Sequence, residues 1–397
     1  MKRIGSFDFL RGLLLIAIIF FHTAVFNYAN IHKIDFSNPP MVVVLISFLT
    51  LWGGAVIFYS GVMNTIMTLR RKTYLKFLFI AGGIYLFLHY ILNIFLGRWA
   101  TDFVNNQPTM TIVANIIRNS SLKFPFLSIF EGSSLLSIGI NLMVLSFIFY
   151  IIFKKEQTDY TNHYIGLSIF GFVIMFTSII RIYLYPLIEQ SLSKQNYFLA
   201  TILSYVVANP YPLFPYLAYG LFACMLGIMI YQNRFILVKK VMIPIASFFC
   251  IFGLVGMLQF EKTISKADYF WYFKTHFELG IFIFVFIFIT YLYLVKHKEF
   301  RWANFIKNFS SISLTIYLFE VLLSETLGKG LSFVYPVWNQ TINGCLLFGL
   351  FNVIIWGVIL IVWKKYNFKY SLEYFWVLLF KKMGKDSTKI KSLKEEG

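Results

Sequence analysis

The stretch that decides the fold lies at the start of the chain, where residues 6–28 read SFDFLRGLLLIAIIFFHTAVFNY. About 20 mainly apolar residues are enough for one membrane-spanning helix. Arg11 and His22 are eleven residues apart in this run, which returns them to within roughly 20° of one helix face with a rise of about 16 Å. We therefore expect Arg11 at one membrane edge and His22 on the same face near the middle of the bilayer. An ionisable residue at that depth is costly to bury and indicates a functional site.

The composition of the whole chain agrees with a membrane protein. Of 397 residues, 59% are hydrophobic, 20% are aromatic and only 13% are charged. Soluble domains usually carry about 25% charged residues, so the sequence predicts a multi-pass protein of the cell membrane. The net charge of +18 does not indicate nucleic-acid binding, because the Lys and Arg residues are concentrated in short loops and in the tail. No small-residue cleavage site follows the first run, so we expect it to remain as a transmembrane helix.

Apolar runs of spanning length recur along the chain. We predict an all-α polytopic integral membrane bundle of about ten transmembrane helices, near residues 9–28, 41–68, 73–96, 133–153, 164–185, 210–231, 241–259, 276–296, 310–328 and 342–363. Residues 1–380 are expected to form a single transmembrane domain. Residues 381–397 are expected to form a polar, basic cytoplasmic tail.

The basic residues predict the orientation of these helices. With the N-terminus in the cytoplasm, the cytoplasmic stretches before Trp363 hold 15 Lys and Arg, and the stretch after Trp363, which includes the tail, adds nine Lys. The outer loops hold nine. Short cytoplasmic loops carry an excess of Lys and Arg, so both termini are predicted to be cytoplasmic.

Three residues of the first helix could carry chemistry. Asp8 and Arg11 are three apart and can pair on one face, either as part of a site or as an anchor at the headgroups. Gly12 allows another helix to approach closely. His22 could act as a general base or as a nucleophile that carries an acyl group, and a buried histidine with a purely structural role is the alternative.

The order Asp-x-x-Arg-Gly with a histidine eleven residues after the arginine resembles the opening helix of the transmembrane acyltransferases. These include acyltransferase family 3 and the heparan-α-glucosaminide N-acetyltransferase-like proteins. Three further stretches resemble elements of these families in the same order: residues 52–61 (WGGAVIFYSG), 132–139 (GSSLLSIG) and 212–220 (PLFPYLAYG). In the last of these, Tyr216 stands where the second group has tryptophan.

The resemblance implies transfer of an acetyl or acyl group from cytoplasmic acyl-coenzyme A to an acceptor at the outer face. The acceptor would be a hydroxyl or amine of a carbohydrate or a lipid-linked sugar. His22 would be the catalytic base or acyl carrier, and Arg11, held by Asp8, would position the donor. The expected partners are therefore acetyl- or acyl-coenzyme A, this acceptor and membrane lipids, with no nucleic acid. Both a monomer and a homo-oligomer remain open.

Basic residues at the end of the second helix suit the donor. Ser60 lies in the Ser-Gly element, and Arg70, Arg71 and Lys72 follow it on the cytoplasmic side. Phosphates favour Arg and Lys, so this cluster is expected to bind coenzyme A, although the same residues also serve as positive-inside anchors.

Three charges deeper in the bundle, Glu320, Glu325 and Arg181, leave alternatives open. The opposite charges could pair across the bundle, or Glu320 could orient His22 or line the acceptor site. The second reading of the whole chain is a transporter or flippase of a lipid-linked or amphiphilic substrate, in which these charges form the pathway. The histidines and acids are scattered and no cofactor motif occurs, so no metal is expected.

Overall fold

The computed structural model describes residues 5–25, 27–29, 41, 52–70, 74–96, 133–153, 160–208, 211–260, 267–298 and 300–382. Within these ranges, 86% of the residues are helical and none lies in a β-strand. The predicted all-α class is therefore confirmed for the described part of the chain. The chain divides into two compact units, Met1–Trp52 with Ile91–Ser128 and Leu292–Gly397, and Gly53–Tyr90 with Ile129–Tyr291.

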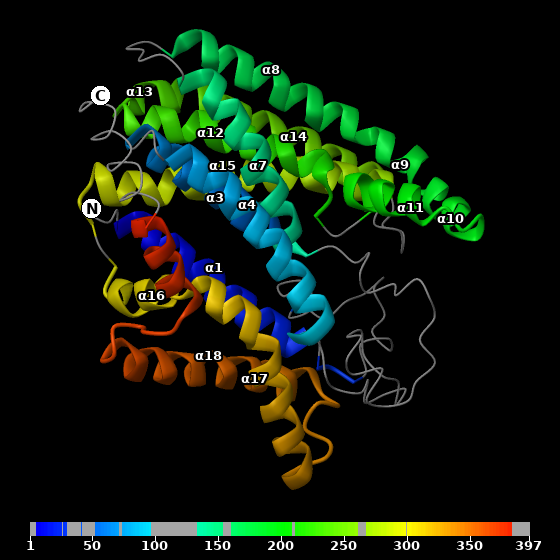
Figure 1. Cartoon of the computed structure of the whole chain (residues 1–397), viewed down its shortest axis with the longest axis vertical. Helices are drawn as coiled ribbons and strands as arrows, with labels where there is room; N and C mark the ends of the chain where they lie inside the picture. Colours follow the sequence, from blue (N-terminus) through cyan, green and yellow to red (C-terminus); the bar gives the residue numbers. More distant parts are fainter. Residues whose placement is uncertain are drawn as a thin grey trace, which may run out of the picture. The chain divides into compact units, whose positions relative to one another are not determined.

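The first unit is built around α1 (Gly5–Val25). This helix packs against α16 (Ala303–Ser310), α17 (Ser313–Val334) and α18 (Ile342–Lys364), as Figure 1 shows. The core between them consists of Leu15, Ile19, Phe309, Ile312, Ile316, Val353, Trp356 and Leu360. A last helix over residues 372–382 and the π-helix η2 (Leu92–Leu96) complete the described part of this unit.

Gly12 sets the close approach of α1 and α16. A Cβ atom on Gly12 would overlap the carbonyl oxygen of Ile306, which leaves no room for any side chain. This confirms the expectation that Gly12 permits a close helix–helix contact.

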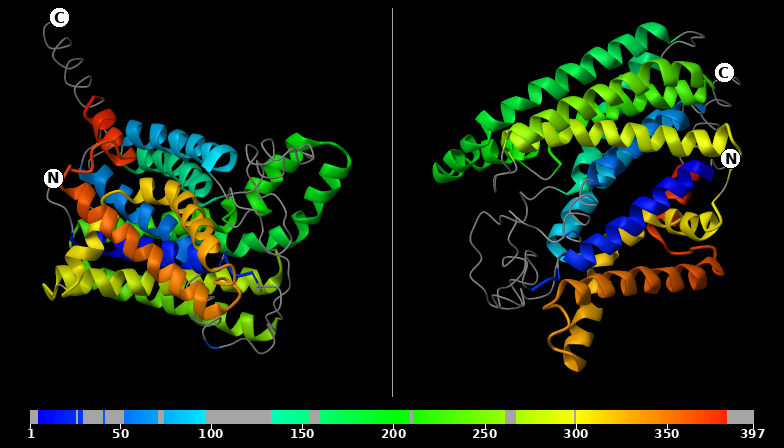
Figure 2. Two further views of the ribbon diagram at one scale, coloured as in Figure 1. Left: turned by 90° about the horizontal axis from the view of Figure 1, so that it is seen from below. Right: turned by 180° about the vertical axis from the view of Figure 1, so that it is seen from behind.

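The second unit is centred on α12 (Leu213–Tyr231), which is buried along most of its length. Figures 1 and 2 show α8 (Thr161–Thr177) and α14 (Ile243–Gln259) beside α12, and α7 (Ser134–Phe153) also packs on it. The unit further contains α3 (Trp52–Arg70), α4 (Tyr74–Ile91) and most of α15 (Tyr269–Leu294). α12 is apolar on all sides and buried within the unit, as expected for such a helix. In contrast, α8 and α14 each leave one apolar face exposed, as lipid-facing helices do.

Short helices link these elements of the second unit. The 3₁₀ turn η3 (Ser178–Ile180) and α9 (Arg181–Leu184) continue α8, and α10 (Pro186–Ser193), α11 (Tyr197–Leu203) and the π-helix η4 (Ser204–Ala208) lead towards α12. Before α14 lie α13 (Phe235–Leu237) and the π-helix η5 (Val238–Met242).

Among the described residues, seven helices are long and apolar enough to cross a membrane. An eighth is added if α16 and α17, which meet at a bend of 85°, count as one broken span. The seven are α1, α7, α12, α15, α18, α8 with its continuation to Leu184, and the continuous segment Phe235–Gln259. All ten predicted spans overlap a helix, but α3 does not meet this criterion and the apolar part of α4 is shorter. The described part of the chain is thus all-helical and compatible with a multi-pass membrane bundle.

Candidate functional site

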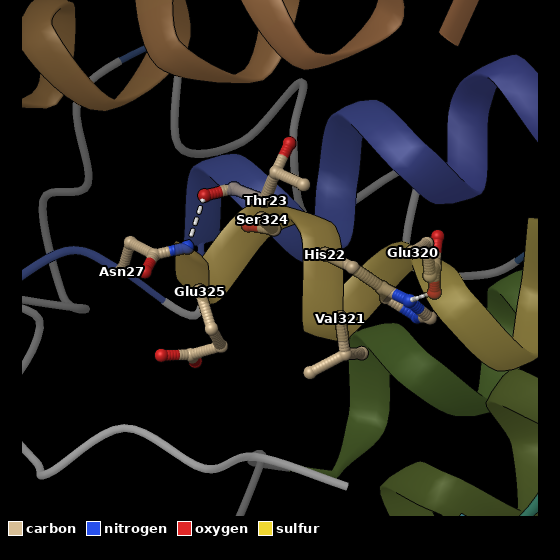
Figure 3. Close-up of a pocket in the computed structure, with 7 residues that line it drawn as sticks. All are labelled: His22, Thr23, Asn27, Glu320, Val321, Ser324 and Glu325. Atoms are coloured by element: carbon tan, nitrogen blue, oxygen red, sulfur yellow. Dashed lines mark hydrogen bonds and ion pairs between the residues drawn. The ribbon is translucent and has the colours of Figure 1, made fainter. Parts of the chain in front are cut away.

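A histidine–carboxylate pair joins α1 to α17 in the first unit. The Nδ1 atom of His22 is hydrogen-bonded to Oε1 of Glu320, although the two residues are 298 positions apart. Figure 3 shows the imidazole and the carboxylate side by side at the edge of a small pocket. The side chain of His22 is 27% exposed and that of Glu320 is 2% exposed, so the pair has a buried acid and an accessible base.

The pocket beside this pair is small and open to solvent, and most of its lining residues have polar side chains. About 230 Å³ of space, part of it open solvent, lies between the lining residues His22, Thr23, Asn27, Glu320, Val321, Ser324 and Glu325. Figure 3 shows Asn27 and Glu325 at the end away from the imidazole. The residues beside His22 therefore supply hydroxyl, amide and carboxylate groups next to the imidazole.

His22 lies closer to the end of its helix than the sequence pattern predicts. The helix begins at Gly5 and ends at Val25. His22 is therefore in its last turn, about 25 Å from the first residue at the usual helical rise. The predicted range, 9–28, had placed it near the middle. The reason is that α1 ends at Val25, where the backbone N–H of Tyr28 donates to the carbonyl of Val25 in a turn at 3.2 Å, so three residues instead of six follow His22 in the helix.

The end of α1 is fixed by hydrogen bonds close to His22. Asn27 Nδ2 donates to the carbonyl oxygen of Thr23 at 2.7 Å, and Asn339 Nδ2 donates to the carbonyl oxygen of Asn27 at 2.9 Å. The backbone N–H of Ala29 donates to the carbonyl of Asn339 at 3.1 Å. Since Asn27 and Asn339 are both buried, these bonds hold the pocket wall in one arrangement.

The pair has a defined chemistry. An ionised carboxylate only accepts hydrogen bonds, so Glu320 selects the tautomer of His22 in which Nδ1 carries the proton. The lone pair of the neutral ring is then on Nε2. Nε2 is therefore the ring atom that can take up a proton from another group. This arrangement suits a general base.

The opposite end of α1 carries the second predicted pair. Arg11 Nη2 lies 3.8 Å from Asp8 Oδ1, which confirms that the two side chains meet on one face. Ser310 Oγ donates to Asp8 Oδ1 at 3.2 Å, so the same carboxylate also ties α1 to the end of α16. Arg11 remains 35% exposed and is thus accessible to an anionic ligand.

The predicted site residues are divided between the two units. Arg181 lies in the second unit, where its Nε donates to the carbonyl of Val207 and its guanidinium lies 3.5 Å from the ring centre of Trp271. Glu320 has His22 as a partner in the first unit. The contact between Glu320 and His22 is the one expected if Glu320 orients the imidazole, and Glu320 also lines the pocket beside it.

The predicted donor-binding residues also belong to the second unit. Ser60 is half-buried on α3, and its Oγ accepts from Asn64 Nδ2 at 3.0 Å. Arg70 is exposed at the end of the same helix. Arg71 and Lys72 lie outside the described residues. The donor-binding role of this group remains a prediction.

Sequence reasoning missed the residues that complete the pocket, namely Thr23, Asn27 and Ser324. Only Ser324 carries a spacing signal, because it follows Glu320 by four positions and so lies on the same face of α17. Thr23 and Asn27 are one and five positions from His22, which does not place them on its helix face. In the described part of the chain, no three His, Cys, Asp or Glu residues gather in a way that could hold a metal ion. Searches among family models, curated proteins and solved structures find no match to this chain.

Proposed function

We propose that this chain is a membrane-embedded acyltransferase that uses acetyl- or acyl-coenzyme A as donor. Its acceptor is a hydroxyl or amine of a carbohydrate or lipid-linked sugar at the outer face. The observation that carries the proposal is the His22–Glu320 pair at the edge of a polar pocket. The resemblance of residues 6–22 to the opening helix of transmembrane acyltransferases supports the same reaction.

His22 acts in this proposal as the general base. Nε2 removes the proton from the acceptor O–H or N–H while the acceptor atom attacks the thioester carbonyl carbon. The C–S bond breaks, the thiolate of coenzyme A leaves, and the proton held by His22 is available to it. Glu320 stabilises the imidazolium through the step. Nucleophilic attack by His22, with an acyl-histidine as intermediate, is the alternative for the same residue.

The remaining residues have roles on the donor side. Arg11, paired with Asp8 and partly exposed, positions the donor near its thioester. Arg70, Arg71 and Lys72 bind the phosphates of coenzyme A, since Arg and Lys are the usual phosphate partners. The proposed topology has both termini in the cytoplasm, as the distribution of Lys and Arg predicts, and with it Arg11 would lie on the side where acyl-coenzyme A is available.

The test is acyl transfer by the purified protein in lipid nanodiscs, followed as release of the coenzyme A thiol. We expect His22→Ala to lower the rate by about 10²–10⁴-fold, the usual contribution of a general base. His297→Asn is the matched control, because His297 is exposed and has a left-handed φ of 50°, a conformation that suits asparagine. Full transfer by His22→Ala would remove His22 from the mechanism. A covalent acyl adduct that forms without acceptor would favour the acyl-histidine route.

One observation favours a transporter or flippase as the second candidate. The helices α16 and α17 are bent by 85° at a short break, and buried Glu320 and Glu325 follow on α17. Broken helices beside buried charges occur at transport sites. A protein that neither binds nor consumes acyl-coenzyme A but moves a lipid-linked sugar between the leaflets of a proteoliposome would establish this function instead.

A further inference from the structure

The start of α17 lacks a cap from its own sequence. The helix begins at Ser313, and the side chain of the preceding residue, Ile312, makes no capping hydrogen bond. The first N–H groups of any α-helix have no partner within the helix, so they need acceptors from elsewhere. α16 ends at Ser310 and meets α17 at 85°, so the acceptor cannot come from a continuous helix.

A residue far along the chain provides the acceptor. One carboxylate oxygen of Glu373 accepts from the backbone N–H of Leu314 and from that of Thr315 at 3.4 Å. The other oxygen accepts from the hydroxyl of Thr315 at 2.7 Å, and the backbone N–H of Leu372 donates to that hydroxyl at 2.9 Å. The last helix, residues 372–382, therefore caps α17 from outside, with an acid at the positive end of the helix dipole.

This cap lies on the helix that carries Glu320. Glu320 follows Thr315 by five positions, with no break of the helix between them. That separation corresponds to a rise of about 7.5 Å along the helix. Glu320 is 1% exposed, so its carboxylate has little freedom to adjust if the start of α17 moves. A displacement of about 1 Å at a catalytic group is enough to reduce a rate by about 10²-fold.

Glu373 also acts near the other end of α1. The charge of Arg11 interacts favourably with the Glu373 carboxylate. Arg11 is paired with Asp8, and Asp8 accepts from Ser310 at the end of α16. The carboxylate of Glu373 therefore caps the helix that carries Glu320 and interacts electrostatically with the residue that we assign to the donor.

We propose that Glu373 is a positioning residue that holds the first turn of α17 and thereby keeps Glu320 in register with His22. The catalytic part of this inference rests on the proposed acyl transfer. The structural part does not, because the hydrogen bonds of Glu373 are independent of any substrate.

The experiment compares Glu373→Ala with Glu373→Gln in the full-length protein. Glutamine keeps an acceptor oxygen for the N–H groups, whereas alanine removes both oxygens. We expect Glu373→Ala to speed hydrogen exchange of the amides of residues 313–318 by at least about tenfold and to lower kcat by about 10–100-fold, with KM nearly unchanged. Glu373→Gln should retain most of the protection of these amides and most of the wild-type kcat. Glu189→Ala, an exposed glutamate in α10, is the control for loss of a carboxylate.

A second readout is independent of turnover. Nitrogen NMR of the His22 ring reports its pairing with Glu320, and Glu373→Ala should shift this signal while Glu189→Ala should not. Thr315→Val removes the hydroxyl that donates to the Glu373 carboxylate. The shifts of the His22 signal in Thr315→Val and in Glu373→Ala should therefore not add in the double variant.

The outcomes separate the two proposals. Faster exchange in residues 313–318 with an unchanged His22 signal would overturn the positioning role. A wild-type protein without acyl transfer would refute the proposed function, but a shifted His22 signal in Glu373→Ala would still support the positioning of the pair.

Discussion

At the scale of single residues, the function of His22 depends on the acid behind it. Glu320 is buried and contacts the imidazole through Nδ1, so it determines both the orientation and the tautomer of the ring. An amide in its place can still accept from Nδ1, but it cannot stabilise the imidazolium by charge. The pair is therefore the most informative target for mutation.

We predict that Glu320→Gln lowers kcat for acyl transfer by about 10²–10⁴-fold while the protein remains folded. The physical reason is the loss of the counter-charge for protonated His22. Initial rates with acyl-coenzyme A as donor measure the effect, and thermal unfolding checks the fold. Glu189→Gln provides an exposed-carboxylate control. A Glu320→Gln protein with wild-type kcat would show that the contact is structural only.

The sequence predicted single residues better than their contacts. Three-residue spacing on a helix was enough to predict the Asp8–Arg11 pair. The partner of Glu320 remained open between Arg181 and His22, because helix periodicity carries no information about contacts 298 residues apart. Glu373 was missed, although it is the only acidic residue between Glu325 and Asp386, which is itself a signal.

At the scale of the helices, the contact between α1 and α16 depends on the absence of a side chain at Gly12. The methyl group of an alanine there would overlap the carbonyl oxygen of Ile306. We predict that Gly12→Ala destabilises the protein by about 1–3 kcal/mol, the usual cost of overpacking. Gly83→Ala in α4 is the matched control, because nothing lies within 4 Å of the new methyl there. Thermal unfolding in one detergent compares the two, and equal stability would contradict the close contact.

The docking of the last helix should depend on pH through Glu373. Burial raises the pKa of this carboxyl above its ordinary value of 4.5, and this effect outweighs the opposing hydrogen bonds from Thr315 and Leu314 and the charge of Arg11. The docked state therefore favours the protonated acid. The stability that protonated Glu373 adds to the docked last helix is fully present below the ordinary pKa and is lost as pH rises through the raised pKa.

We accordingly predict that exchange of the amides of residues 313–318, corrected for the intrinsic pH dependence, becomes faster in the wild type as the pH rises above 4.5, the ordinary pKa of the carboxyl. Glu373→Gln cannot ionise, so its corrected exchange should stay constant across the same range. A constant wild-type profile would mean that Glu373 does not change its protonation on docking.

At the scale of the whole molecule, the fold class followed from composition. The chain is 59% hydrophobic and 13% charged. Such a chain must satisfy its backbone polar groups in helices within a membrane. The number of spans is harder to predict. Apolar runs do not show where a helix changes direction, as at the 85° bend between α16 and α17, or where it changes type, as at the π-helix after α4.

The orientation of the bundle in the membrane determines whether the donor can reach Arg11. The positive-inside rule puts Lys240 in the cytoplasm and Lys194 outside, and both residues are exposed. We predict that Lys194→Cys reacts with an impermeant maleimide added to intact cells, whereas Lys240→Cys reacts only after permeabilisation. Cys224, Cys250 and Cys345 are replaced by alanine in both variants, so that each protein has a single thiol. The reverse pattern would place the N-terminus and Arg11 outside, away from cytoplasmic acyl-coenzyme A, and would exclude the proposed direction of transfer.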